Sequence, residues 1–200
     1  MNETANCTFN RFSEIGIRVG SPLLNPYFEI FETLRGQSPE LVLRLRKPLI
    51  WAYSWAVPSS EAIAEIAQYT PLIELGAGSG YWAWLLRQAG ADVIALDTLT
   101  AAPPYWTPVL KGDASSLGDN PGRALFLCWP PSDSPMAAQA LQSFPGSTVI
   151  SVGEWEGRTA DAEFQRLLRQ DWELIRQMGL PKWPGFRDEL RIFRRREIIS

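Results

Sequence analysis

The chain has 200 residues, a net charge of −3 and a sequence pI near 5.1. This length is typical of one domain with a sizeable hydrophobic core. The acidic balance argues against a nucleic-acid partner, because nucleic-acid-binding domains usually carry a basic surplus. No apolar run approaches the roughly 18 residues of a membrane span, and the N-terminus lacks the apolar segment of a signal peptide. We therefore expect a cytoplasmic protein without a membrane partner.

Histidine is absent from the sequence, and Cys7 and Cys128 are its two cysteines. A histidine general base, a Ser-His-Asp triad and a histidine metal site are therefore excluded. Two cysteines are also too few for a zinc site or a disulfide framework, so we predict no bound metal. Any proton transfer must use Asp, Glu, Tyr, Lys, Cys or the substrate itself.

The first part of the chain, residues 1–58, is expected to form an N-terminal extension and helical cap on a core that spans residues 59–200. Apolar residues near helical spacing predict a helix within Pro22–Leu34. A second, short helix is predicted over Pro39–Arg46. Together the two helices are expected to form the N-terminal cap.

Aromatic residues are dense between Pro48 and Pro58. Such a segment suits either a core plug or the wall of a ligand site. We expect Trp51 to fill the core, and Tyr53 and Trp55 to line a substrate site, because the segment directly precedes the helix that leads into the first strand.

A strand, a glycine turn, a helix and a second strand follow one another between Pro71 and Asp97. Pro71–Leu75 is a short apolar run typical of a buried strand, a helical pattern covers Tyr81–Ala89, and Val93–Leu96 predicts the next strand. This order predicts half of a nucleotide-binding α/β fold.

The turn between the first strand and its helix has a composition suited to a ligand. Glycines at 76, 78 and 80 remove the side chains that would keep a ligand away from the backbone. Backbone N–H groups at the N-terminus of a helix suit a negatively charged group. Asp97, at the carboxyl end of the second strand, is placed to accept hydrogen bonds from ribose hydroxyls. The alternative is an α/β domain whose glycines serve the turn alone.

The spacing Glu-x-Gly-x-Gly-x-Gly resembles motif I of the class I S-adenosylmethionine (SAM) dependent methyltransferases, whereas dinucleotide-binding turns read Gly-x-Gly-x-x-Gly. The resemblance covers residues 59–200 in element order. It implies SAM as the cofactor, with the glycines beneath its aminoacyl part and an acid at its ribose. The cofactor-binding residues that it implies are Glu74, Gly76, Ala77, Gly78, Gly80, Asp97, Asp113 and Trp129.

Asp113 follows the predicted third strand, Trp106–Leu110, at a position where members of this family contact the adenine. The alternative role for its side chain is to cap the next turn. The fourth strand is predicted over Ala124–Cys128 and ends in Trp129-Pro130-Pro131.

In amine-directed members of the family, strand four ends in Asp/Asn/Ser-Pro-Pro-Tyr/Phe, and the polar residue accepts a hydrogen bond from the target nitrogen. Trp129 stands at that place here, which argues against methylation of nucleobase amino groups. We expect Trp129 to stack on a flat substrate or on the adenine, and Pro130 to lie at the substrate site. The alternative for Trp129 is packing beneath the helix predicted over Met136–Phe144.

The fifth strand is predicted over Ser147–Val152, and Glu154 follows it at the edge where ligands bind in open α/β sheets. Glu154 is the candidate catalytic residue, as a general base or a substrate-orienting group; the alternative is a structural partner of an arginine. A terminal hairpin is predicted from Trp172–Met178 and Glu189–Arg195, with Trp183 in its loop at the substrate mouth.

The expected fold is α/β: a seven-stranded, mostly parallel, Rossmann-like methyltransferase sheet with an N-terminal helical cap. The resemblance predicts a SAM-dependent methyltransferase that transfers a methyl group to an oxygen or nitrogen atom of a small aromatic or apolar molecule. The alternative is a protein of this fold that binds SAM without methylating, as a scaffold-type enzyme or a silent subunit of a complex. A nicotinamide oxidoreductase is disfavoured by the glycine spacing. The oligomeric state is not predicted.

Overall fold

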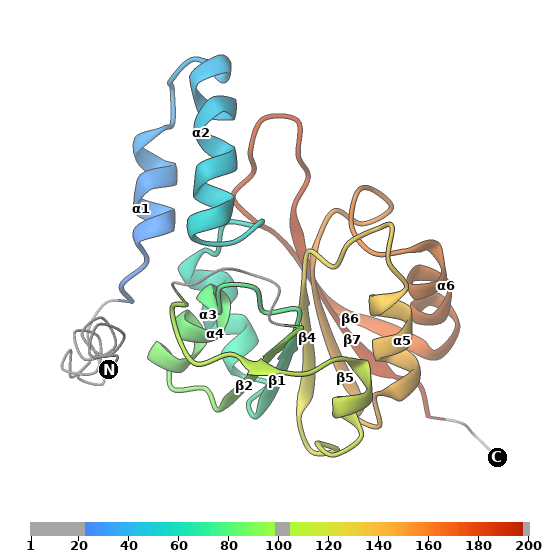
Figure 1. Cartoon of the computed structure of the whole chain (residues 1–200). Helices are drawn as coiled ribbons and strands as arrows, with labels where there is room; N and C mark the ends of the chain where they lie inside the picture. The colour runs from blue at the N-terminus through green and yellow to red at the C-terminus, as the bar shows by residue number, and fades with distance from the viewer. Residues whose placement is uncertain (1–22, 99–104, 198–200) are drawn as a thin grey trace, which may run out of the picture.

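A seven-stranded sheet runs through the protein, with helices on both of its faces (Figure 1). The computed structural model describes residues 23–98 and 105–197. Its elements, in chain order, are α1 (Pro26–Thr33), α2 (Pro39–Ala52), α3 (Ser60–Ala67), β1 (Leu72–Leu75), α4 (Tyr81–Gln88), β2 (Val93–Asp97), β3 (Leu110–Lys111), the short 3-10 helix η2 (Ala114–Leu117), β4 (Ala124–Cys128), α5 (Met136–Ser143), β5 (Thr148–Gly153), α6 (Ala162–Asp171), β6 (Trp172–Gly179) and β7 (Glu189–Arg195).

The strands lie in the order β3-β2-β1-β4-β5-β7-β6. All neighbouring pairs from β3 to β5 are parallel, and β7 runs antiparallel to both β5 and β6. The predicted fold class, a mostly parallel Rossmann-like sheet with one antiparallel strand near its edge, is confirmed. In a sheet of this kind the loops that follow the parallel strands meet along one edge, where ligands bind.

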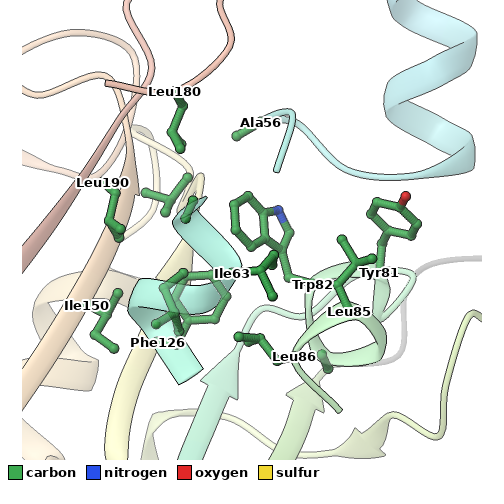
Figure 2. Packing of buried hydrophobic residues seen from close by; sticks show 14 of the residues in the cluster. Ala56, Ile63, Tyr81, Trp82, Leu85, Leu86, Phe126, Ile150, Leu180 and Leu190 are labelled. Atoms are coloured by element: carbon green, nitrogen blue, oxygen red, sulfur yellow. The ribbon is translucent and has the colours of Figure 1, made fainter. Parts of the chain in front are cut away.

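Two hydrophobic cores cover the two faces of the sheet, because alternate residues of each strand point to opposite faces. Phe126 of β4 joins the core beneath α3 and α4, whereas its neighbours Leu125 and Leu127 join the core beneath α5 and α6. Figure 2 shows the first core, where the Trp82 indole of α4 lies beside the Phe126 ring. The two rings meet edge to face, with centroids 5.5 Å apart.

Helices α1 and α2 stand together over the end of the sheet at which α3 and α4 lie, beside the loop that joins β6 to β7 (Figure 1). Buried polar contacts hold α1 there. The Tyr27 N–H donates to the Tyr81 hydroxyl at 3.1 Å, and this hydroxyl donates to Asn25 Oδ1 at 2.8 Å. Trp183, from the β6–β7 loop, donates its indole N–H to the Tyr27 hydroxyl at 3.2 Å. The cap is therefore tied to both α4 and the terminal hairpin.

Two elements differ from their sequence-based prediction. The second helix does not end at Arg46 but continues through Pro48 to Ala52. A proline removes one helical hydrogen bond and usually ends a helix. Here Leu49 and Tyr53 pack against the hydrophobic core and hold the last turn in place.

The third strand is shorter than predicted and begins later, at Leu110. Trp106 lies outside it, because its backbone N–H donates to the Ser79 carbonyl and its indole N–H donates to the Ala52 carbonyl, both at 2.8 Å. These contacts hold Trp106 beside the cap, so that it does not pair with β2. Within the residues that the structure describes, no helix is long and apolar enough to cross a membrane.

Truncating Trp183 should separate the cap from the core. Trp183 is 1% exposed and lies edge to face against Phe31 at 5.1 Å between centroids. We expect Trp183→Ala to lower the free energy of unfolding by about 3–5 kcal/mol, the range for deleting a buried aromatic ring. Leu174→Ala is the matched control, because Leu174 is 41% exposed and should lose less than about 0.5 kcal/mol. Urea unfolding of both variants measures the difference; equal losses would contradict the cap contact.

Candidate functional site

The glycine turn joins β1 to α4 at the ligand-binding edge of the sheet. Gly80 caps α4 with φ +76°, and a Cβ atom there would lie 2.9 Å from Val109 Cγ2, so this glycine is required for packing. Gly78 has φ +55°, and a Cβ atom there would meet nothing within 4 Å. The backbone at Gly78 is thus bare and faces open space, as a close-approaching ligand requires.

Asp97 lies directly against this turn. The strands β1 and β2 pair in parallel with Leu75 opposite Leu96, so the turn and the acid follow neighbouring strand ends. The Gly78 N–H donates to Asp97 Oδ2 at 2.8 Å. The structure therefore brings together the glycines and the acid that motif I predicts for one ligand.

Glu74 lies beneath the turn and is 1% exposed. Burial raises the pKa of its carboxyl to about 8, although a hydrogen bond from the Ala83 N–H and the charge of Arg87 oppose the rise. The other carboxyl oxygen, Oε2, is buried without a hydrogen-bond partner among the described residues. Because this pKa lies above neutral pH, Glu74 keeps its proton there and is a buried neutral acid.

A cavity of about 500 Å³ opens between the turn and the cap. Glu74 and residues 76–79 form one wall, and α2 with the segment that follows it forms the other. Trp82 and Cys128 contribute to its base, and this set contains four of the predicted cofactor-binding residues: Glu74, Gly76, Ala77 and Gly78.

Three side chains that line the cavity carry buried polar atoms without a hydrogen-bond partner among the described residues. They are Oε2 of Glu74, the indole nitrogen of Trp82, and Nε and Nη2 of Arg46. An unpaired buried polar group destabilises a fold by about 1–3 kcal/mol. Such groups at one cavity point to a ligand that would complete their hydrogen bonds.

The aromatic segment before α3 lines the same cavity. Tyr53 is half-buried and stacks on Tyr27 with 4.9 Å between ring centroids, and Trp55 is 49% exposed. Both line the cavity, as expected for a ligand wall. The prediction that Trp51 fills the core is wrong, because its side chain is 76% exposed and also lines the cavity. The longer α2 carries it away from the core.

Trp129 follows β4 with an unusual backbone, φ +51°. Its ring stacks on Trp55 with 5.1 Å between centroids and lies near Phe186, on the face of the sheet opposite to α5. The alternative, in which Trp129 packs beneath α5, is therefore wrong. Trp129 supports the cavity wall through Trp55, and Pro130 behind it is buried, with its carbonyl accepting from the Ala160 N–H at 2.8 Å.

Asp188, in the β6–β7 loop, supports Trp129 behind the cavity wall, and the sequence did not single it out. It is fully buried, and its Oδ1 accepts a hydrogen bond from the Trp129 indole at 2.8 Å. Burial raises the pKa of Asp188 to about 6, while the indole N–H opposes the rise. No motif marks this aspartate, since it reaches Trp129 only through the antiparallel pairing of the terminal hairpin.

Three predicted site residues have structural contacts instead of positions on the cavity. Glu154 is buried, with Oε1 accepting from the Arg187 N–H at 2.9 Å and Oε2 3.7 Å from Arg158 Nε, as in the alternative of a structural arginine partner. Asp113 is exposed and caps η2, where its Oδ1 accepts from the Ser115 N–H at 2.9 Å. Trp183 is buried against α1, because the hairpin loop folds under the cap and not around the cavity mouth.

Across residues 23–98 and 105–197, no group of three or more His, Cys, Asp or Glu side chains is arranged to hold a metal ion. No protein-family model matches the chain, and no curated protein matches its sequence.

Solved structures of methyltransferases are similar to the chain in fold. The magnesium protoporphyrin IX methyltransferase ChlM of Synechocystis PCC 6803, with bound SAM, is 14% identical with a TM-score of 0.49, and the match covers 96% of this chain and 92% of that one. The glycopeptide N-methyltransferase MtfA, complexed with S-adenosylhomocysteine, is 16% identical with a TM-score of 0.46, over 68% of this chain and 88% of that one.

The CcbJ methyltransferase of Streptomyces caelestis is 15% identical with a TM-score of 0.45, and the match covers 70% of this chain and 97% of that one. At these identities and TM-scores, the similarities assign no activity, cofactor or substrate to this chain.

The buried carboxyl of Glu74 should make stability depend on pH. Its pKa is raised from 4.5 to about 8, so between these values the folded state holds a proton that the unfolded state has released. The contribution of Glu74 to stability therefore falls as pH rises, by up to about 1.4 kcal/mol per pH unit, and levels off above the folded pKa.

We expect Glu74→Gln to remove this pH dependence. The free energy of unfolding of the variant should therefore rise relative to that of the native protein between pH 5.5 and pH 8. Denaturant unfolding at several pH values measures the difference. Glu173→Gln, at an exposed position on β6, is the control, and its free energy of unfolding should depend on pH as that of the native protein does. A pH-independent difference for Glu74→Gln would contradict the buried neutral acid.

Proposed function

We propose that the protein is a SAM-dependent methyltransferase that transfers a methyl group to an oxygen or nitrogen atom of a small aromatic or apolar molecule. The observation that carries the proposal is the bare turn at Gly78, hydrogen-bonded to Asp97 and open to a cavity with unpartnered polar groups. When bound, SAM would supply the methyl group.

The residues around the cavity fit this cofactor. The turn from Gly76 to Gly78 would contact the aminoacyl part through its backbone, since Gly78 carries no side chain that would obstruct it. Asp97 would accept hydrogen bonds from the ribose hydroxyls, and its hydrogen bond to the Gly78 N–H already holds it at the turn. The unpartnered groups of Glu74 and Trp82 offer further polar contacts from the cavity base.

The walls of the cavity favour a flat, apolar acceptor. Trp51 and Trp55 expose large ring surfaces along it, and such surfaces bind planar apolar groups through stacking and hydrophobic contact. The Trp55 ring is held in place by its stack on Trp129, which in turn donates to Asp188. The role of these residues would be to orient the acceptor and exclude water.

The arrangement does not call for a strong base. Methyl transfer gains mainly from proximity and orientation, and holding two reactants in line can replace much of the entropic barrier. The Glu154 carboxylate is engaged by Arg187 and Arg158, and the Trp129 indole N–H by Asp188. The acceptor would therefore lose its proton to solvent or enter as the anion.

Removing the acid at the ribose site should abolish tight cofactor binding. We expect Asp97→Ala to lower the affinity for SAM and S-adenosylhomocysteine about thirty- to a hundredfold, the effect of losing two hydrogen bonds to a carboxylate. Isothermal titration calorimetry measures it, and Asp119→Ala, at an exposed acid, should bind as the native protein does. A native protein that binds neither ligand but responds to NADH would overturn the proposal.

The glycine turn offers a second test that separates strain from binding. Gly78 and Gly36 both have left-handed backbones, φ +55° and φ +80°, and open space around a Cβ atom, but only Gly78 faces the cavity. Either glycine-to-alanine substitution should lower the free energy of unfolding of the protein by about 1 kcal/mol. Only Gly78→Ala should lose SAM affinity, by tenfold or more; equal binding by the two variants would argue against the turn as a cofactor site.

Turnover is tested with a panel of phenols, amines and carboxylates and radiolabelled SAM. Product formation that disappears in Asp97→Ala would support the proposal. SAM binding without turnover on the whole panel would favour the alternative, a protein of this fold that binds SAM without methylating. That alternative is consistent with Trp129, which stands where amine-directed methyltransferases have a polar hydrogen-bond acceptor.

A further inference from the structure

Arg46 lines the cavity and carries buried polar atoms that have no partner among the described residues. Aromatic rings hold the plane of its guanidinium group. Its guanidinium lies 3.7 Å from the centroid of the Phe186 ring and 5.6 Å from that of Trp55. Contact with two rings holds the orientation of the guanidinium, in the way that arginine stacks on aromatic faces. The neighbouring Lys47 also lines the cavity but is exposed, so water solvates its ammonium group.

The hydrogen-bonding capacity of Arg46 is not used. Nε and Nη2 are buried and have no partner among the described residues. Asp188 and Glu154 lie close enough to act on its charge, as do Tyr27 and Arg158. Asp188 Oδ1 accepts from the Trp129 indole and Glu154 Oε1 from the Arg187 N–H, whereas Asp188 Oδ2 is buried without a hydrogen-bond partner among the described residues. Neither carboxylate forms an ion pair with Arg46 within the part of the chain that the structure describes. Burial lowers the pKa of Arg46, because the guanidinium is partly removed from water.

Two adjacent N–H groups on a rigid, partly desolvated guanidinium match the two oxygens of a carboxylate. We propose that Arg46 anchors a carboxylate of the methyl acceptor, which would then be a flat apolar molecule with an acidic group. This inference rests on the proposed function, because it names the acceptor class of the same site. Trp51 and Trp55 would bind the apolar body of this molecule and Arg46 its charge.

Arg46 lies away from the proposed ribose site but lines the same cavity as Gly76 and Gly78, where the aminoacyl carboxylate of SAM would also lie. The test therefore separates the acceptor from the cofactor as the source of the carboxylate. Asp97 ends β2, on one side of β1, whereas β4, β5 and β7 lie on the other side. Arg46 packs against Phe186 of the β6–β7 loop and beside Trp55, which stacks on Trp129 after β4. The guanidinium is thus across the glycine turn from the proposed ribose site.

The test compares 2-naphthoate with its neutral isostere 2-naphthamide by isothermal titration calorimetry, with and without saturating S-adenosylhomocysteine. We expect the native protein to prefer the acid about ten- to a hundredfold, the range for charge-assisted hydrogen bonds. Arg46→Met should remove this preference while leaving the affinity for naphthamide within about threefold. Arg46→Lys should restore part of it, since a point charge replaces the fork.

Arg44→Met is the matched control. Arg44 lies on the same helix, is exposed and is not among the cavity-lining residues, so its loss changes the net charge equally. It should keep the preference for the acid. Circular dichroism of each variant reports whether the helix is intact, and because Arg46→Met removes unpartnered donors, we expect no loss of thermal stability.

Three results would overturn the proposal. Equal or undetectable binding of the acid and the amide by the native protein would do so. An acid preference that survives in Arg46→Met would assign it to another group. Weaker binding of S-adenosylhomocysteine by Arg46→Met, with unchanged binding of 5′-methylthioadenosine, which lacks the carboxylate, would assign Arg46 to the cofactor.

Failure of the proposed function is distinguishable from these results. A native protein that does not bind S-adenosylhomocysteine would overturn the methyltransferase proposal. The naphthoate titrations without S-adenosylhomocysteine would still report whether Arg46 binds a carboxylate.

Discussion

The hydrogen bond from the Gly78 N–H to the Asp97 carboxylate connects the ends of two neighbouring parallel strands. It requires a bare backbone at Gly78, because the residue has φ +55°, and it requires the acid to be the last residue of β2. The turn, the start of α4 and the cavity mouth are placed by this contact. Because β1 and β2 pair in parallel, the glycine turn and Asp97, 19 residues after Gly78, follow neighbouring strand ends and form one site.

Ionisable groups are buried at the cavity and behind its wall, and some of their polar atoms have no hydrogen-bond partner among the described residues. Burial raises the pKa of Glu74 to about 8 and that of Asp188 to about 6. Two nitrogens of Arg46 have no hydrogen-bond partner within residues 23–98 and 105–197. Perturbed and unpaired groups of this kind gather at functional sites, where a ligand completes their interactions. Glu74 and Arg46 line the space between the turn and the cap, and Asp188 lies behind its wall, where it accepts a hydrogen bond from Trp129. The unpaired groups and the cavity therefore indicate the same place.

The cap converts an open edge of the sheet into an enclosed site. Tyr27 is held by Tyr81 on one side and by Trp183 on the other, and it stacks on Tyr53 at the cavity wall. Anchoring α1 in this way fixes the start of α2, whose far end carries Arg46 and Trp51 into the cavity lining. Packing between helix and hairpin therefore sets the shape of the acceptor side, just as the glycine turn sets the cofactor side.

The sequence by itself determined the order of strands and helices, the glycine turn and its pairing with Asp97, because these depend on local hydrophobic patterns and on a motif within 24 residues, from Glu74 to Asp97. It also identified Tyr53 and Trp55 as cavity residues. Only the tertiary structure decided the course of α2 through Pro48, the exposure of Trp51, and the burial of Trp183 and Glu154. Asp188 and Arg46 join the site through contacts between residues far apart in the chain. A single sequence does not encode such contacts as a pattern, since they arise from how the cap and the terminal hairpin pack on the sheet.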